Sequence, residues 1–579
     1  MSVEEFNTYH EYLLNLLNHH EELDNEDFVP EVSHFVQLVK QSMEIRKMVI
    51  KNTNWNLIIE AFPSVFKKIR QTLNVNPFFI RLLNAILLYC RIIFCVDSTN
   101  EMDLYTLEKL YETPKYIINA FCMLSNSDVR EKIVERAVET LSMVAQLLPI
   151  YKLGLELDVS LGLDIDQDVQ KNVTETTYFL VYSIDYMTRN IKDDIMLVIF
   201  LNNIINKNDK FLQYALRDNE FKEKVIEKYF LTKVLYEDVY NSLINRPKEN
   251  VNNEENLNKK ELIALQVLKK ILTHESITPY FEGKLVHDVN KNFDENYEIL
   301  SLWSRISSTL LCNSTIFDTF QLTNIMIWVF MILENVSMSI INIFQNHKIN
   351  SIDESYIDTE LIPKTDKLYD ILINNLDILS HLCQFQHCQK FVLHYKGIEK
   401  LGELLGVLHT NCYRLSVHID DKKGGKLTLN DNLKKNPDFN NWDKVIDKEN
   451  NKIKSINFPH IKSLIIEILT KFLAFDNETI VELSKIKEIQ NLMKAESILE
   501  VVLSNCAIDD NEPFIKERAI MFLKYALHNN QKNQEFVAKL EQRTTVDSQS
   551  ETLLEEIGYE VDISKNGKIG LKKTSTSIQ

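Results

Sequence analysis

The sequence predicts an all-α protein, an armadillo-like helical-repeat solenoid, on three observations. The 579 residues include only 11 glycines and 11 prolines, and about a third of the average glycine usage disfavours folds built on many tight turns. Apolar residues recur at helical spacing through most of the chain. The chain also repeats one order of features: an apolar stripe, a polar turn and a second apolar stripe. The alternative fold, an irregular helical bundle, would show the same stripes, so this recurring order favours the solenoid.

The repeat is clearest in the C-terminal third of the chain. One copy consists of a packing helix, a polar turn at Cys388 and Gln389, and a second pair of helices opened by Gly397. Its apolar positions are Leu376, Leu379, Leu382, Phe391, Val392, Ile398, Leu401, Leu404 and Leu405. Two further copies follow, the first with Ile466, Leu469, Phe472, Leu473, Ile480 and Leu483, and the second with Ala519, Phe522, Leu523, Ala526, Leu527 and Val537. Fainter copies surround Ala137 and Leu201. Roughly ten repeats of about 40 residues would fill the chain.

Polar stretches and a turn signal divide the chain into segments. Residues 246–260 predict a loop between an N-terminal armadillo-like block, 1–245, and a second block, 261–419. Residues 420–456 predict a polar insertion on the surface of the solenoid, followed by a C-terminal helical domain at 457–542. The last segment, 543–579, predicts a linker, a small β-hairpin and a flexible tail, because Asn566 and Gly567 form the strongest short hairpin signal.

Charge and composition narrow the classes of partner. The net charge of -18 opposes binding to nucleic acids and anionic membranes, which need dense Lys and Arg. The first thirty residues are acidic and show neither a signal peptide nor a basic transit peptide, so we expect a cytoplasmic protein. The apolar runs at 77–96 and 325–344 contain charged residues and predict buried helices rather than membrane spans. Eight scattered cysteines without a CxxC pair indicate reduced thiols.

No catalytic motif is visible in the sequence. Phosphate loops, nucleophile elbows, HExxH zinc helices and kinase signatures are all missing, so neither catalytic residues nor a cofactor is predicted. A weak alternative is a copper or zinc site formed by His381, Cys383, His387 and Cys388. On one continuous helix, His381 and Cys388 share one face while Cys383 and His387 lie on nearly the opposite face, so the four could not bind one metal ion. A turn between 384 and 387 would partly remove this obstacle. Core cysteines and turn-lining histidines are the favoured interpretation.

The four tryptophans do not form the ladder that some solenoids use to bind peptides, in which Asn follows Trp by four residues. They are Trp55, Trp303, Trp328 and Trp442, and the residues four positions later are Ile59, Ser307, Ile332 and Ile446. A peptide groove of the nuclear-import type is therefore not predicted. We expect these tryptophans to be core or interface anchors.

An ordered motif lies near the C-terminus. Its residues are Phe458, Pro459, Cys506, Asp509, Asn511, Pro513, Phe514, Ile515, Glu517, Ala519, Asn533 and Gln534, followed by the hairpin pattern at 558–571. Over about the last fifth of the chain, this pattern resembles the C-terminal domain of the ataxin-10 family. One departure is Glu496-Ser497, where the family pattern has Gly-Gly. The size and Asn-rich composition resemble a budding-yeast-type fungal member, a group labelled as copper-transport associated.

The resemblance implies a cytoplasmic, non-enzymatic adaptor or scaffold for other proteins, with roles in cytokinesis or cell survival signalling. Two alternatives are a copper homeostasis protein, acting directly or indirectly, and a self-associating assembly, since solenoid ends can stack. Within the motif, we expect Asp509 or Asp510 to cap a helix that starts near Pro513. We also expect Phe514 to anchor that helix on the preceding repeat.

Overall fold

The structure is a computed structural model. It describes residues 3–19, 27–52, 57, 60, 77–94, 133, 136–137, 195–207, 212–213, 215–245, 257–285, 293–313, 317–346, 362–420, 424–429, 446–447, 452–474, 480–541, 559–563 and 569–573. The chain forms two compact units, Met1–Tyr280 and Phe281–Gln579. Each unit is described by itself.

The first unit is helical in its described parts. Its elements are α1 (Val3–Asn18), α2 (Phe28–Gln41), α3 (Met43–Asn52), α5 (Pro77–Phe94), α10 (Ile195–Lys207), α12 (Asn219–Phe221), the π-type helix η3 (Lys222–Tyr240), α13 (Asn241–Ile244) and α14 (Lys259–Leu272); α15 (Ile277–Leu285) crosses into the second unit. Asn258 and Glu261 form a capping box at the start of α14. This cap makes Lys259 and Lys260 helical, although the sequence places them in the 246–260 loop, whose residues 246–256 lie outside the described part. Because α14 packs on α10, the boundary between the units falls after this loop.

The second unit carries the repeats. Its helices are α16 (Phe293–Asn313), α17 (Thr319–Asn346), α19 (Ile362–Leu382), α20 (Gln386–His394), α21 (Gly397–Asn411), the short 3₁₀ helix η10 (Ser455–Asn457), α22 (Ile461–Lys471), α23 (Ile480–Ala495), α24 (Ile498–Ser504), α25 (Ile515–Leu527) and α26 (Gln531–Glu541). Its strands are β1 (Leu415–Asp420), β2 (Gly424–Leu429), β3 (Ile446–Asp447), β4 (Lys452–Ile453), β5 (Tyr559–Ile563) and β6 (Ile569–Lys573).

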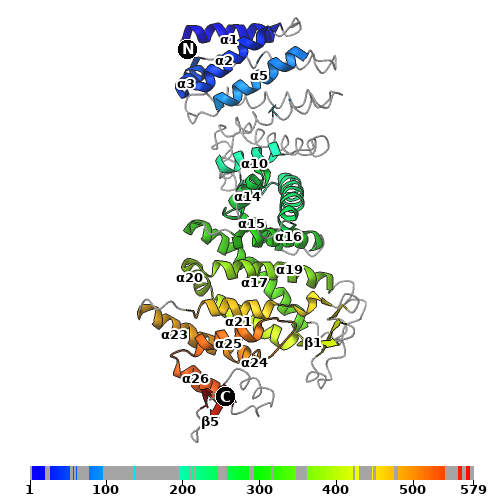
Figure 1. Ribbon diagram of the computed structural model, residues 1–579, viewed down its shortest axis with the longest axis vertical. Helices are drawn as coiled ribbons and strands as arrows, with labels where there is room; N and C mark the ends of the chain where they lie inside the picture. Colours follow the sequence, from blue (N-terminus) through cyan, green and yellow to red (C-terminus); the bar gives the residue numbers. More distant parts are fainter. Residues whose placement is uncertain are drawn as a thin grey trace, which may run out of the picture. The chain divides into compact units, whose positions relative to one another are not determined.

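The helices of this unit repeat in a fixed order and pack in two layers. A three-helix group, α19 to α21, is followed by a second, α22 to α24, and then by the pair α25 and α26. In one layer α16, α19, α22 and α25 contact one another in succession, and in the other α17 contacts α21, which contacts α24. In Figure 1, α16, α19, α21, α25 and α26 follow one another along the long axis of the view. The predicted all-α helical-repeat fold is therefore confirmed.

The core of the second unit comes from the predicted stripes. All the apolar positions named for α19 are buried, and so are Leu401, Leu404 and Leu405 of α21. Trp303 and Trp328 are buried, and their rings contact Phe281 at centroid distances of 5.9 and 5.2 Å. These two tryptophans are core anchors, as predicted, whereas Trp55 and Trp442 lie outside the described residues.

Gly397 marks the tightest approach between α20, α21 and α17. A Cβ atom added there would lie 2.8 Å from Cζ of Phe330 and would also collide with Cγ1 of Val392. We expect Gly397→Ala to destabilise the protein by about 1–3 kcal/mol through overpacking. Gly406→Ala, on the same helix with nothing within 4 Å, should be neutral or stabilising by up to about 1 kcal/mol. Thermal unfolding of both variants tests this, and equal shifts in Tm would refute it.

Among the described residues, one helix is long and apolar enough to cross a membrane, Thr319–Gln345 within α17. Its most apolar window is 56% buried inside the protein, and α17 packs on α19, α20 and α21. The apolar sequence of α17 is therefore explained by its place in the core, which is the outcome predicted for the run at 325–344 and is compatible with a soluble protein.

Short strands occur in and beside the predicted insertion and at the C-terminal end. Strand β1 pairs antiparallel with β2, and β3 with β4; the sequence did not predict these pairs. Strands β5 and β6 also pair antiparallel, from Tyr559 opposite Lys573 to Ile563 opposite Ile569. The predicted hairpin is confirmed, although its turn at Asn566 and Gly567 lies outside the described residues.

Candidate functional site

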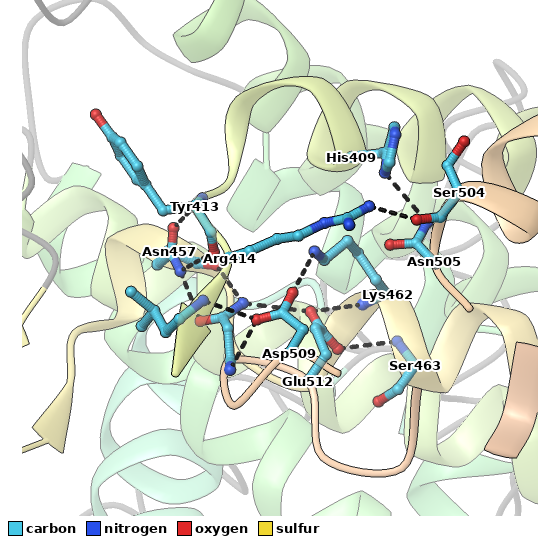
Figure 2. Close-up of polar contacts among 12 residues, drawn as sticks. His409, Tyr413, Arg414, Asn457, Lys462, Ser463, Ser504, Asn505, Asp509 and Glu512 are labelled. Atoms are coloured by element: carbon cyan, nitrogen blue, oxygen red, sulfur yellow. Dashed lines mark hydrogen bonds and ion pairs between the residues drawn. The ribbon is translucent and has the colours of Figure 1, made fainter. Parts of the chain in front are cut away.

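The candidate site is the loop from Cys506 to Phe514, which joins α24 to α25. Its inward-facing residues Asp509, Asn511 and Glu512 are buried, whereas Ile508 and Phe514 are 62% and 71% exposed. The inner side is polar and the outer side is apolar, the reverse of the usual arrangement in a soluble domain. Figure 2 shows how the buried groups converge from several elements.

Asp509 fixes the loop to the segment that follows α21. Its Oδ1 accepts hydrogen bonds from the backbone N–H groups of Leu415 and Asn511, both at 3.0 Å. The N–H of Asp510 donates to the carbonyl of Leu415 at 2.9 Å. The Oδ2 atom of Asp509 forms an ion pair with Nζ of Lys462 at 3.2 Å, with the two side chains 3% and 1% exposed. Lys462 thus places a buried cation beside the loop.

Two asparagines tie the loop to the residues just before α22. The Nδ2 of Asn457 donates to Oδ1 of Asn511 at 2.6 Å, and the Nδ2 of Asn511 donates to the carbonyl of Asn457 at 3.2 Å. Asn457 also accepts the N–H of Tyr413 at 2.8 Å and donates to its carbonyl at 3.0 Å. Tyr413 and Asn457 flank the predicted insertion, so these bonds join its two ends.

Glu512 caps the first turn of α22. Its two carboxyl oxygens accept the backbone N–H groups of Lys462 and Ser463, at 3.2 and 2.9 Å. These N–H groups have no partner within their own helix, and a carboxylate there also meets the positive end of the helix dipole. Burial away from water nevertheless raises the pKa of Glu512 to about 7, while the nearby Lys462 acts in the opposite direction.

The raised pKa of Glu512 gives stability a defined pH dependence. An acid whose pKa rises from 4.5 to about 7 on folding binds more protons when folded, so its contribution to stability falls as pH rises between these values, by roughly 3 kcal/mol in all. We therefore expect the free energy of unfolding of the wild-type protein to fall, relative to that of Glu512→Gln, as the pH rises from 4.5 to 7. Urea unfolding at several pH values measures it. A wild-type advantage that grows with pH would show that the carboxylate is the favoured form.

The chemistry of this cluster is structural. Lys462 and Asp509 are almost fully excluded from solvent, so a substrate in solution cannot reach the charged groups. Next to them, Arg414 donates through Nη2 to the carbonyl of Ser504, and Asn505 hydrogen-bonds His409 at 3.2 Å between Nδ2 and Nδ1. Burial, the largest cause, lowers the pKa of His409, with Arg414 acting in the same direction. The contacts of Ser504 and Asn505 fix the segment just before the loop.

Most of the predicted motif residues gather around this loop. Phe458 and Pro459 are buried beside Asn457, and the Phe458 ring lies 5.8 Å from Phe344 and 6.3 Å from Tyr369. Ile515 and Ala519 are in the core of α25. Others lie elsewhere: Asn533 is buried and donates to the carbonyls of Gln490 and Ala526, Cys506 is half-buried, and Pro513, Glu517 and Gln534 are exposed.

Two local expectations are wrong. Asp509 and Asp510 do not cap α25, which begins at Ile515; the capping acid is Glu512, and it caps α22. Phe514 does not anchor α25 on the preceding repeat, because it is exposed and adopts a left-handed backbone with φ of 65°. This conformation directs its side chain away from the core, and Ile515 takes the buried position instead.

The structure does not bring the four residues of the alternative copper or zinc site together. The turn at 383–385 separates His381 on α19 from His387 and Cys388 on α20, and no group of three or more His, Cys, Asp or Glu side chains that could hold a metal occurs among the described residues. The Nε2 of His387 hydrogen-bonds Oγ1 of Thr323 at 2.8 Å. Burial raises the pKa of the Cys388 thiol to about 12 and that of Cys383 further, which opposes formation of the thiolate that binds a metal.

The Glu496-Ser497 departure is accommodated by strain. Ser497 adopts φ of 57° directly before α24, and its side chain makes no capping hydrogen bond. A left-handed conformation costs a non-glycine residue about 1–2 kcal/mol. Glycine avoids this cost but lowers stability by about 0.4–1 kcal/mol, because it increases the conformational entropy of the unfolded chain. We expect Ser497→Gly to raise Tm and Ser497→Ala to leave it nearly unchanged. A drop in Tm for the glycine variant would show that Ser497 stabilises the turn.

Sequence reasoning missed Tyr413, Leu415 and Asn457, and it gave no buried role to Lys462 and Glu512, which lie within the stretches that carry the family resemblance. A buried Lys or Glu has no local sequence signal, since both are usually exposed. Tyr413 and Leu415 contribute backbone groups, which any residue carries.

The comparisons with known proteins place the loop within a family domain. The family model described as "Spinocerebellar ataxia type 10 protein domain" matches residues 461–572, which include the whole loop. An ataxin-10 homolog of Candida glabrata is 36% identical over 375 residues, 64% of each chain. One of Debaryomyces hansenii is 27% identical over 553 residues, 94% of this chain and 91% of the relative. Ataxin-10 of Xenopus tropicalis is 35% identical over 79 residues, 14% of this chain and 16% of its own.

The fold defines an all-helical repeat protein, and the 506–514 loop lies in its second compact unit. The C-terminal part of the chain matches the ataxin-10 family domain, and the chain resembles ataxin-10 homologs over most of its length. Its match spans just under two thirds of the length of the Candida glabrata relative.

Proposed function

We propose that this protein is a non-enzymatic, cytoplasmic adaptor that binds other proteins, and that the 506–514 loop is one of its contact surfaces. The observation that carries the proposal is Phe514, an aromatic residue that is 71% exposed and held at positive φ. Bulky residues rarely adopt this conformation, and such strain persists where the surrounding structure enforces it, often at functional sites.

The cluster beneath the loop supports this role. A binding loop loses less conformational entropy on association if it is ordered beforehand, and here Asp509, Asn511 and Glu512 order it from below. Ile508, also exposed, adds a second apolar group. On α25, Ile520 and Met521 are also half exposed. Aromatic and aliphatic anchors of this kind typically dominate the energy of protein interfaces.

Affinity purification of the tagged full chain from its own cells tests the proposal. Phe514→Ser should abolish capture of at least one protein that specifically accompanies the wild type, because it removes the main anchor of the loop. Phe320→Ser is the matched control, since Phe320 is 66% exposed on α17, away from the loop. Unchanged Tm values would show that both variants are folded. Turnover of a substrate by the pure protein would overturn the non-enzymatic reading.

The process served by the adaptor is proposed from the family resemblance, with cytokinesis first and cell survival signalling second. The copper alternative is not favoured, because the thiols of Cys383 and Cys388 are buried and the four candidate ligands do not converge. Self-association is the remaining alternative. Light scattering at two concentrations separates it from a monomeric adaptor, since the mass of a self-associating chain rises with concentration.

A further inference from the structure

A second surface lies between α17 and α21, within the second unit. It is a pocket of about 160 Å³, whose apolar wall includes Phe330, Leu333 and Met338. Phe330 and Leu333 are almost fully buried, whereas Met338 is 53% exposed at the rim. The volume is well below the 300–1,000 Å³ of typical cofactor and drug sites and close to that of a cavity known to hold one benzene. It suits a single apolar side chain.

The rim of the pocket carries a fixed pattern of charge. Nζ of Lys400 forms an ion pair with Oε1 of Glu334 at 2.9 Å and lies 5.2 Å from the centre of the Phe330 ring. Lys400 is therefore held by two attractions and its charge is matched. Glu403, one turn further along α21, also lines the pocket and has no ion pair with any described residue. One carboxylate at the rim remains to be neutralised.

We propose that this pocket binds a short segment of a partner protein that inserts one apolar side chain and places a Lys or Arg against Glu403. The inference rests on the proposed adaptor function and specifies one of its ligands. The apolar wall provides the contact area and the exposed Met338 adapts to its shape. Glu403 selects a basic neighbour for the anchor, and the net charge of -18 attracts basic segments and repels acidic ones.

The charge of Glu403 also sets the specificity of the pocket. An acidic residue beside the anchor would lie near Glu334 and Glu403 and would be repelled by both. Reversing the charge at 403 should therefore do more than weaken binding; it should change which peptides bind. This expectation distinguishes the pocket from a non-specific apolar surface, which would bind peptides of either charge.

The test is a selection of random 12-residue peptides displayed on phage against the full-length protein. Enriched peptides should carry a Leu, Met or aromatic residue within a few positions of a Lys or Arg. By fluorescence polarisation, Met338→Asp and Glu403→Lys should each weaken their binding at least tenfold. The matched controls are Ile327→Asp, an exposed apolar residue on α17 outside the pocket, and Glu399→Lys on α21; both should retain binding.

Selection against the Glu403→Lys protein should enrich acidic peptides in place of basic ones. The inference is overturned if no peptide is enriched, if the enriched peptides lack a basic residue, or if the pocket variants bind them as well as the controls do. Affinity purification separates this outcome from failure of the adaptor function. If every protein that accompanies the wild type also accompanies Met338→Asp at the same level, the adaptor function stands and the pocket is refuted, whereas a wild type that captures nothing would refute the adaptor itself.

Discussion

Replacing Lys462 with methionine is expected to destabilise the second unit by about 3–5 kcal/mol, the range for breaking a buried ion pair from one side. The methionine nearly matches the shape of lysine, so the loss is electrostatic. Asp509 and Glu512 would remain buried without the cation that lies 3.2 Å from Asp509. Lys462→Met should unfold at a lower temperature than the wild type, and the amides of the 506–514 loop should exchange hydrogen faster.

Lys471→Met is the matched control for this prediction. Lys471 also has an ion pair, with Glu467 at 3.3 Å, but both side chains are about one third exposed. Water and the ion pair with Arg518 at 2.6 Å stabilise the remaining Glu467 carboxylate, and the cost should be near 1 kcal/mol or less. If the two methionine variants unfold alike, then the buried pair does not stabilise the loop. A second substitution, Asp509→Asn, should recover part of the loss in Lys462→Met, because it removes the unpaired charge.

The helices were predictable because their signal is local. Core stripes such as Leu376, Leu379 and Leu382 repeat within a few residues, and burial of one helix face requires that spacing. The family motif and the terminal hairpin are also local patterns. Turn residues were less predictable, since Ser497 and Phe514 adopt backbone conformations that favour glycine.

The polar cluster was not predictable for a different reason. Asn457 and Asn511 are 54 positions apart, and Leu415 and Asp509 are 94 positions apart, so neither contact leaves a periodic trace in one sequence. The motif pointed to the correct segment, but which of its acids is buried depends on how the repeats stack. The expectation for Phe514 failed for the same reason: an aromatic residue is usually an anchor in the core, and only the three-dimensional packing shows it outside.

Asn457→Ala is expected to have the second large effect, because one side chain satisfies three buried groups. Without it, the N–H and carbonyl of Tyr413 and the Oδ1 of Asn511 lose hydrogen bonds of 2.6–3.0 Å. Each buried group left without a partner costs about 1–3 kcal/mol, so a total of at least 3 kcal/mol is expected. The two flanks of the insertion would separate, and the 506–514 loop would lose one of its supports.

Hydrogen exchange resolves this effect by position. In Asn457→Ala the amides of Tyr413, Leu415 and Asn511 should exchange faster, whereas α16 should be protected as in the wild type. The matched control is Asn411→Ala, which removes a hydrogen bond to Val407 within α21 at an exposed position and should cost under about 0.5 kcal/mol. Equal protection of Tyr413 in both variants would mean that β1 and η10 are held together by apolar packing alone. If instead Asn457→Ala also weakens capture of the proteins lost in Phe514→Ser while Asn411→Ala does not, then the buried cluster acts on binding by ordering the loop.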